Sequence, residues 1–496
     1  MSLSFAASGG DICEMDRWQK NEDGTVKTDE EGNALVKLIY VSEGDSYSFE
    51  RPGYEVRASL EDHNISFYIK NGKAFMPIAT FSDLFLESWH IGYIYNGENV
   101  FLSGLMGLDD DVKNDEGKTA KALFYEIENT ERTKELAEFT YNELTLTLDM
   151  HYGLAEEHGI YSFDKYIDSI GLKQSLLSTD ATEFDHALKE LLEYYIGDQH
   201  SGFKEAGPYD TSGNDDDLFS FLSDRTSPSV SRTSMDDKYS EHRMQAEGIL
   251  GEEEDENGDP IPVPYMEIGN TAYITFDNFQ MLYYDNTEKY YSEEFKKNVK
   301  KYISTDTIAL VYYANRQINR KKSPIKNIVI DLSLNGGGIA EGAVFILGWL
   351  LGNCQISTGN PLTDARYTVN YLVDVNLDGH IGNEDSLENY LGEKYNFFCL
   401  TSLNSFSCGN LVPSVLQESG YVTIIGKPSG GGACEVEFAA TADGSFYQFS
   451  GIKKLCRFKN GSYYSIDTGV IPDFTISKLD HFYDREWLTE FIKSLP

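Results

Sequence analysis

Short apolar runs and stretches of helical periodicity alternate through the second half of the chain. Asn327–Leu332 centres on a continuous apolar run, which is typical of a strand in a parallel sheet covered on both faces. A glycine turn, Asn335–Gly338, and an apolar helix, Ala340–Leu351, follow it. Similar strand-like runs occupy Thr271–Phe276 and Val422–Ile425. This part of the chain is therefore predicted to be an α/β domain with a buried sheet.

The turn Asn404–Asn410 separates a strand-like run from a stretch with apolar residues at helical spacing, which ends at Gly420. A serine at such a turn, Ser407, is exposed and lies beside backbone N–H groups that have no helical partner. Those groups can stabilise an oxyanion, so the turn suits a nucleophile; the alternative is a plain helix cap. Pro413 requires either that the regular helix begins near Asn410 or that it bends.

Residues 118–196 show helical periodicity, and the last helix ends in the sequence GDQHSGF, which contains His200. A single histidine after a helix is more often structural than catalytic, and both interpretations stay open on this evidence. The glycines of Asn335–Gly338 are equally open. They offer backbone N–H groups to a cleft, or they let a helix pack closely on a strand; a nucleotide-binding fingerprint is not matched.

The start of the chain is first polar and then β-rich. Residues 1–36 are predicted to form a polar arm. Residues 37–110 carry short alternating runs, and Asn71-Gly72 between two such runs is a strong hairpin signal. This stretch resembles the small β-rich module at the N-terminus of copper amine oxidases and in many bacterial cell-surface enzymes. The resemblance implies an accessory module facing the cell wall, and it implies no copper site.

Charge and length limit the classes of function. The chain has 496 residues and a formal charge of −40, which argues against nucleic-acid binding because phosphate contacts require clustered Lys and Arg. The acidic surface is either simply solvated or attracts basic substrates or calcium. No apolar run approaches the ~18–20 residues of a transmembrane segment. The six scattered cysteines are compatible with one or two disulfides or with free thiols.

Two acidic stretches stand out. Residues 206–262 are polar, include Glu252–Glu256, and are predicted to form a long loop. The insertion Asp374–Asp385 matches an EF-hand-type loop and is similar to the calcium loops of dockerin modules. Its predicted calcium ligands are Asp374, Asn376, Asp378, His380 and Asp385. The alternative is a solvated acidic turn.

Three separated motifs resemble the C-terminal processing, or tail-specific, serine peptidases and their tricorn-core relatives. They are Ile328–Gly338 (IVIDLSLNGGG), Leu400–Gly432 and Gly469–Phe474 (GVIPDF). GDQHSGF is similar to the G-D-x-H-[ST] element of the tricorn-like branch. The resemblance covers residues 118–496 and implies an α/β, crotonase- or Clp-protease-like core. The implied organisation is a polar arm (1–36), a β-rich module (37–110), a helical cap with the catalytic histidine (111–205), an acidic loop in place of a PDZ domain (206–262) and a peptidase core (263–496).

The same resemblance implies individual roles. Ser407 matches the nucleophile, and His200 matches the histidine base, whose pKa near neutrality suits proton transfer. Asp467 lies near the position of the family's orienting carboxylate. The implied oxyanion-hole donors are the backbone N–H groups of Cys408 and of Gly338 or Gly337. Gly431–Ala433 replaces the segment that holds the general-base lysine of the processing branch, so a lysine–serine dyad is not expected; Lys427 is nearby but out of register.

These features predict a secreted or cell-surface serine endopeptidase with a peptide or protein substrate. It is expected to need no cofactor for catalysis, to carry a structural calcium, to associate with the cell wall and to have lost its leader. The alternative is a non-catalytic ligand- or peptide-binding protein on the same fold. A third hypothesis, calcium-dependent surface adhesion, depends only on the acidic insertion and the β-rich module.

Overall fold

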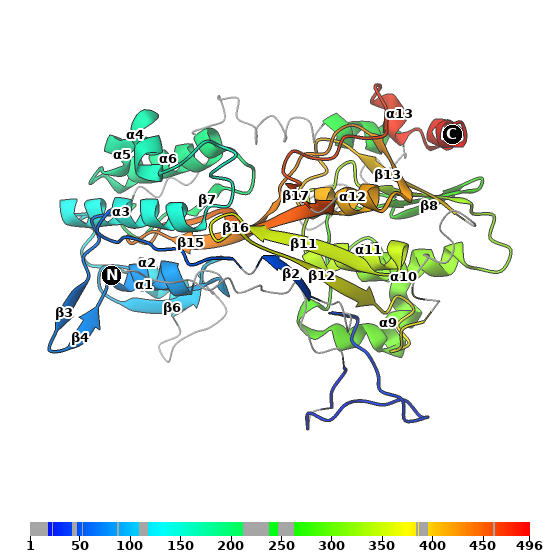
Figure 1. Ribbon diagram of the computed structural model, residues 1–496, viewed down its shortest axis with the longest axis horizontal. Coiled ribbons are helices and arrows are strands. Elements are labelled where there is room, and N and C mark those ends of the chain that lie inside the picture. The colour runs from blue at the N-terminus through cyan, green and yellow to red at the C-terminus, as the bar shows by residue number, and fades with distance from the viewer. Residues whose placement is uncertain are drawn as a thin grey trace.

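The computed structural model describes residues 18–21, 23–41, 47–51, 53–86, 89–108, 118–211, 238–246, 262–382, 385, 395–459 and 462–496. Figure 1 shows the helices of the first two hundred residues on one side of the molecule and the later α/β elements on the other. The long strand β16 (Phe446–Lys459) runs between the two parts. Its position lets one strand contact both the helical region and the α/β region.

A six-stranded, mostly parallel sheet lies at the centre of the α/β region, in the order β18-β14-β13-β10-β9-β8. The central strand β10 pairs in parallel with β9 and β13, whereas β8 adds antiparallel at the edge. The strands are β8 Tyr265–Ile268, β9 Thr271–Thr275, β10 Asn327–Asp331, β13 Asn396–Thr401, β14 Val422–Gly426 and β18 Phe474–Thr475. The predicted strands are thus confirmed.

Helices cover both faces of this sheet, as its continuous apolar strands require. Ile328 and Ile330 point to one face and belong to a buried cluster with α10, α11 and α12, whereas Val329 points to the other and packs with α13 and α14. The covering helices are α10 Thr307–Ile318, α11 Ala340–Leu351, α12 Cys408–Ser419, α13 Asp480–Tyr483 and α14 Arg485–Lys493, and η3 Tyr284–Tyr291, α9 Glu293–Asn298 and η4 Val299–Lys301 precede α10.

A second, antiparallel sheet of eight strands was not predicted. Its main path is β1-β12-β11-β16-β15, to which β2, β7 and β17 add by pairing with β12 or β16. Its strands are β1 Ile39–Val41, β2 Tyr47–Arg51, β7 Gly202–Glu205, β11 Cys354–Asn360, β12 Ala365–Val373, β15 Cys434–Ala440, β16 Phe446–Lys459 and β17 Ser462–Ser465. Because its members come from four distant parts of the sequence, this sheet joins the start of the chain and the helical region to the α/β region.

The helical prediction for residues 118–196 is confirmed. Leu188 and Leu192 are fully buried and pack in one cluster with Tyr447 and Phe449 of β16. The π-helical segment η2 carries the chain from α6 toward His200, and such segments often occur at functional sites. The elements are α2 Ala120–Tyr125, α3 Lys134–His151, α4 Phe163–Ser169, α5 Lys173–Leu176, α6 Ala181–Lys189 and η2 Glu190–Ile196.

The N-terminal region contains the predicted hairpin, formed by β3 (Tyr68–Lys70) and β4 (Lys73–Phe75) around Asn71-Gly72. A helix, α1 (Ile78–Phe85), and a second hairpin, β5 (Ile91–Tyr95) with β6 (Val100–Gly104), follow it. The region therefore mixes hairpins with a helix, and β1 and β2 belong to the large antiparallel sheet.

The stretch 206–262, predicted to be a loop, contains a helix at 238–246 in its described part. The buried Arg243 of this helix forms an ion pair with Asp277, which is partly exposed. The acidic run Glu252–Glu256 lies outside the described residues. Over the ranges given above, no helix combines the length and apolarity needed to cross a bilayer. The described cysteines are all free thiols, and Cys13 lies outside the described residues.

Candidate active site

Ser407 occupies a sharp turn between β13 and α12, in a backbone conformation that side chains rarely adopt. Its φ is 55° and its ψ is −123°, at the N-cap of α12. Strain of this kind persists only where the surroundings hold it, and it is concentrated at functional sites. Here its N–H donates to the Gly431 carbonyl at 2.9 Å, and its own carbonyl accepts the N–H of Leu411 at 2.8 Å. The helix begins at Cys408 rather than near Asn410, so Pro413 lies within it.

The glycine turn after β10 packs directly against this serine. A Cβ at Gly337 would lie 2.7 Å from Ser407 Cβ and 3.2 Å from its Oγ, and φ at Gly337 is 114°. The two segments are joined further by the N–H of Phe406, which donates to the Asn335 carbonyl at 3.0 Å. The side chain at 337 therefore has to be absent for the serine to approach this backbone.

The predicted oxyanion donors differ in whether their N–H groups already donate a hydrogen bond within the protein. The Gly337 N–H donates to Asn335 Oδ1 at 3.0 Å, which favours Gly338 as the second donor. The Gly337 carbonyl accepts the N–H of Phe279 at 2.7 Å, so the peptide unit that carries the Gly338 N–H is held in place. Among the described residues, no hydrogen-bond acceptor is found for the N–H groups of Gly338 and Cys408.

The Cys408 side chain connects the two candidate donors. Its thiol donates to the Gly338 carbonyl at 3.3 Å. Burial, together with the nearby Glu341 carboxylate, raises the pKa of this thiol to about 12, so the thiol stays protonated and remains a donor at neutral pH. The Cys408 side chain therefore contacts the glycine turn as a neutral thiol.

His200 lies on the loop between η2 and β7, and it reaches the nucleophile turn. Its ring packs edge-on against the Phe406 ring, with 4.8 Å between the centroids. Because Phe406 precedes Ser407, this contact places the histidine beside the serine turn, although more than two hundred residues separate them in sequence. The side chain is 6% exposed.

Two side chains, Asp198 and Gln448, fix the histidine loop. The Asp198 carboxylate accepts the backbone N–H groups of His200 at 3.1 Å and Ser201 at 2.6 Å. Gln448 of β16 donates its side-chain N–H to the His200 carbonyl at 2.7 Å. Asp198 was not among the predicted site residues, although an aspartate that accepts the N–H two residues later is a recognisable turn signal.

Asp467 lies against the glycine cluster that follows β14. Its Oδ1 accepts the N–H groups of Gly432 at 3.2 Å and Ala433 at 3.1 Å. A Cβ at Gly431 would lie 2.0 Å from the Asp467 carbonyl oxygen, so the two loops are in contact. The Gly431 carbonyl accepts the N–H of Ser407. Gly431 therefore contacts both the Asp467 loop and the nucleophile turn.

A buried polar network that was not predicted joins α12 to the Asp467 loop. Asn410 is fully buried; its Nδ2 donates to the Ile466 carbonyl at 2.9 Å, and its Oδ1 accepts the Ser429 hydroxyl at 2.7 Å. The Ser429 hydroxyl also accepts the N–H of Val470 at 2.6 Å. A buried asparagine in the first turn of a helix carries no distinctive sequence signal, because its partners come from distant loops.

The aromatic and acidic groups beneath the site also interact. Burial raises the pKa of Tyr152 well above its ordinary value, and the carboxylates of Asp198 and Asp467 raise it further. Tyr152 therefore stays neutral near both carboxylates. Lys427, which the sequence placed near the site, lies over the Tyr239 ring at 5.7 Å, on the helix at 238–246.

The acidic insertion Asp374–Asp385 is placed apart from these residues and contacts the polar arm. Asp374 and Asp385 are buried, and both their carboxylates accept N–H groups of the loop itself. His380 Nε2 lies 3.3 Å from Asp29 of the arm. Within the described part of the chain, no three His, Cys, Asp or Glu side chains converge as metal ligands. A calcium loop also uses amide and carbonyl oxygens, and calcium binding stays a prediction.

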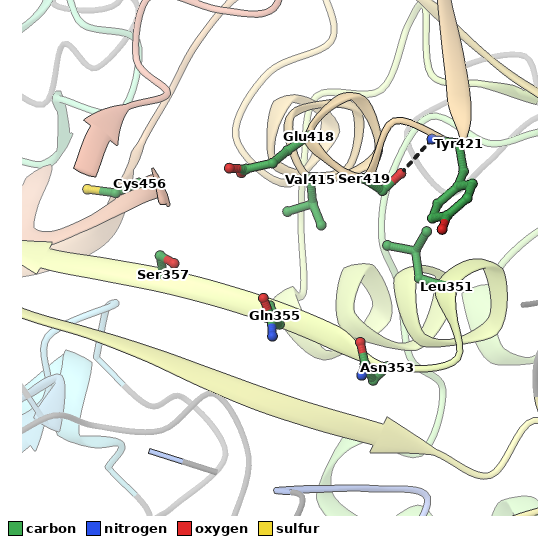
Figure 2. A pocket seen from close by; sticks show the side chains of 9 residues that line it. All are labelled: Leu351, Asn353, Gln355, Ser357, Val415, Glu418, Ser419, Tyr421 and Cys456. Carbon is green, nitrogen blue, oxygen red and sulfur yellow. Dashed lines mark hydrogen bonds between the residues drawn. The ribbon is translucent and has the colours of Figure 1, made fainter. Parts of the chain in front are cut away.

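A pocket of about 290 Å³ lies at the opposite end of α12 from Ser407 (Figure 2). Gln355 and Ser357 of β11 line one side, and Val415 and Glu418 of α12 line the other. The pocket's lining residues on α12, Val415 to Ser419, lie roughly 12–18 Å along the helix from Ser407. The pocket is therefore distinct from the candidate active site.

Comparison with known proteins identifies the family. Residues 270–476, which include Ser407, Asp467 and the glycine turn, match the model of peptidase family S41. This part of the chain therefore belongs to peptidase family S41, the family of the C-terminal processing and tricorn-like peptidases. Family membership implies a serine peptidase. No curated protein matches the chain.

Solved structures give overall likenesses at low identity. A proposed peptidase from Parabacteroides merdae is 13% identical, with a TM-score of 0.44 over 72% of this chain and 96% of that one. A lipoprotein from Streptococcus agalactiae is 14% identical, with a TM-score of 0.37 over 71% and 96%. The photosystem II D1 C-terminal processing protease is 15% identical, with a TM-score of 0.28 over 44% and 46%. These likenesses are weak, so the family assignment rests on the sequence match.

Proposed function

We propose that this protein is a serine endopeptidase in which Ser407 is the nucleophile and His200 is the general base. The observation that carries the proposal is the strained Ser407 backbone, packed against Gly337 between two N–H groups for which no acceptor is found among the described residues. A plain helix cap does not require positive φ or a side-chain-free neighbour at this distance. Both features are typical of a serine whose hydroxyl is presented to a substrate.

In the proposed reaction, His200 takes the hydroxyl proton as Ser407 Oγ attacks the peptide carbonyl carbon. The carbonyl oxygen becomes an oxyanion, which the N–H groups of Cys408 and Gly338 stabilise. The protonated His200 then gives its proton to the leaving amine, and an acyl-serine ester remains. A water molecule, deprotonated by His200, attacks the ester, and the acid product leaves as the proton returns to Ser407.

Supporting roles follow from the contacts of the loops. Asp198 holds the backbone of the histidine loop, and Asp467 holds the glycine cluster against which the serine turn lies. We assign Asp467 the role of the acid that favours the protonated form of His200 through its charge. The proposed core is crotonase-like: β10 followed by α11, and β13 followed by α12, bring the glycine turn and Ser407 to the same edge of the parallel sheet. Export and cell-wall association stay predictions from the sequence.

The test is labelling with a fluorophosphonate probe, which reacts only with an activated serine. Wild-type protein is expected to be labelled, and Ser407→Ala and His200→Ala are expected to lose labelling while keeping the circular dichroism spectrum of the wild type. Ser419→Ala, at the far end of the same helix, serves as the matched control and should be labelled normally. Absence of labelling in well-folded wild type would favour the alternative, a non-catalytic binding protein on this fold.

A further inference from the structure

Large exposed hydrophobic side chains are concentrated in the N-terminal region. Of the 21 such side chains within the described ranges, 11 lie between Tyr68 and Met106. Single exposed apolar residues are normal on a soluble protein, but a concentration of this kind marks an interaction surface. The β3–β4 hairpin holds three of these side chains and is the part that projects furthest from the surrounding elements at the lower left of Figure 1.

The hairpin has no packed face. All six residues of its two strands are exposed, including Ile69 at 73% and Tyr68 at 58%. Tyr68 and Phe75 stack on each other with 5.7 Å between the ring centroids, so the two rings form one apolar unit beside Ile69. A two-stranded hairpin that is solvated on both faces is marginally stable in water. A surface that covers its apolar side chains would therefore stabilise it.

The segment that contains the hairpin differs in charge from the rest of the chain. Asp and Glu make up 81 of the 496 residues, yet none occurs between Asn64 and Ser82. Lys70 and Lys73, which flank the Asn71-Gly72 turn, are both exposed. The tip is thus basic and apolar on a protein with a formal charge of −40. Because the Debye length is about 8 Å at physiological ionic strength, a projecting tip can approach an anionic surface while the acidic remainder is screened from it.

We propose that the β3–β4 hairpin docks on a lipid bilayer with anionic headgroups. Ile69, Tyr68 and Phe75 enter the boundary between headgroups and acyl chains, and Lys70 and Lys73 contact the headgroup phosphates. Aromatic rings and the long stems of lysine are favourable at this boundary. A projecting tip fits a bilayer better than a peptide, which binds in a groove. A second copy of the chain would bring no anionic groups to the hairpin from the matching segment, because residues 64–82 contain no Asp or Glu.

The test is co-sedimentation of the full chain with unilamellar vesicles made of equal parts of phosphatidylcholine and phosphatidylserine. Wild type is expected to pellet with these vesicles and to pellet much less with pure phosphatidylcholine. Ile69→Ser is expected to lower the bound fraction severalfold, as is the double variant Lys70→Glu/Lys73→Glu. Ile471→Ser is the matched apolar control, because Ile471 is 75% exposed but lies elsewhere. Lys297→Glu/Lys300→Glu, on exposed lysines of the α9–η4 segment, is the matched charge control.

Insertion itself can be measured by fluorescence. Ile69→Trp is expected to shift its emission to shorter wavelength on mixed vesicles, and Ile471→Trp is not. The proposal is overturned if wild type stays in the supernatant with mixed vesicles, or if the control variants lower binding as much as the hairpin variants. A shift of wild type, but not Ile69→Ser, to a dimer on size exclusion without vesicle binding would assign the hairpin to a second copy instead.

Discussion

The candidate active site and the junction between α1 and α3 both bury polar groups, but they satisfy them differently. Around Ser407, buried groups are held by neutral hydrogen bonds, such as those from Asn410 and to the backbone of Asn335. At the α1–α3 junction, two buried carboxylates face threonine hydroxyls of the opposite helix. Thr147 donates to Asp83, and Thr80 donates to Glu143. The Asn410 side chain and the Asn335 carbonyl do not titrate, whereas the two carboxylates at the junction can take up protons.

The difference indicates where pH acts on this protein. A neutral network of this kind holds the backbone beside the strained serine through groups that do not titrate. Buried carboxylates, in contrast, favour the protonated form, because burial penalises charge. The junction therefore links the stability of the helical region to pH, separately from the pH dependence of catalysis.

The largest expected effect comes from Gly337→Ala, which breaks the neutral arrangement at its tightest point. The added methyl group would lie 2.7 Å from Ser407 Cβ, at a residue whose φ is 114°. We expect kcat to fall by roughly 100-fold or more, because displacement of the serine or of the donor loop by about 1 Å is enough for such a loss. Steady-state peptide hydrolysis measures it.

Gly342→Ala is the matched control for that substitution. Gly342 lies in α11, and a Cβ there would approach its nearest neighbours, Phe279 and Thr307, only to 3.4–3.5 Å. The substitution should therefore leave kcat unchanged and slightly stabilise the helix. Equal loss of activity in both variants would mean that the glycine turn does not position the serine.

The second prediction concerns the titrating junction. Burial raises the pKa of Asp83 from 3.8 to about 7, and burial with the neighbouring Asp83 raises that of Glu143 from 4.5 to about 8. Since both folded-state values exceed the unfolded ones, stability is full below the unfolded values and is lost as pH rises toward 7 and 8. The unfolding free energy of wild type is expected to fall between about pH 4 and about pH 8, and that of Glu143→Gln to fall less.

Denaturant titrations at several pH values measure this difference. Glu135→Gln, on an exposed position of the same helix, is the control and should follow the wild type. His151 has a pKa lowered by burial, so it acts in the opposite direction, and only the difference between variant and wild type isolates Glu143. Parallel pH curves for wild type and Glu143→Gln would refute a coupled carboxylate pair.

A smaller effect is expected from Asn410→Ala, which removes two buried hydrogen bonds between α12 and the loops at Ile466 and Ser429. We expect a loss of about 1–3 kcal/mol in unfolding free energy. Activity should fall as well, because the loop that carries Asp467 loses its anchor. Asn315→Ala, which removes the hydrogen bond from Trp349 at 3.1 Å, is the control for a loss of stability without a loss of activity.

The smallest effect is expected from calcium at the acidic insertion. A cation beside the buried carboxylates of Asp374 and Asp385 would relieve their repulsion, which together with burial raises the pKa of Asp374 to about 7. If the sequence prediction holds, calcium should raise the thermal unfolding temperature by a few degrees relative to chelator, and magnesium should not. Asp374→Asn should abolish the increase. Identical melting curves with calcium and with chelator would support the alternative, that the insertion is a solvated acidic turn.

The local elements could be predicted because they depend on short-range pattern. Asn327–Leu332 and Ala340–Leu351 were placed by apolar periodicity, and the Asn71-Gly72 hairpin was placed by its turn chemistry. The position of Ser407 on a strand-to-helix turn followed from the same pattern. These features depend on the preferences of residues that are close in sequence, so a single sequence is enough to indicate them.

Tertiary structure alone decided which distant residues meet. The contact between His200 and Phe406, the approach of Gly337 to Ser407 and the link from Asn410 to Ser429 join residues from separate strands and loops. The eight-stranded antiparallel sheet and the carboxylates buried between α1 and α3 also depend on long-range packing. The elements and the chemical groups they carry follow from residues that are near one another in the chain. The burial of a side chain and its distances to other residues arise only when the elements pack together. These quantities set the charge state of buried carboxylates and the backbone strain at Ser407.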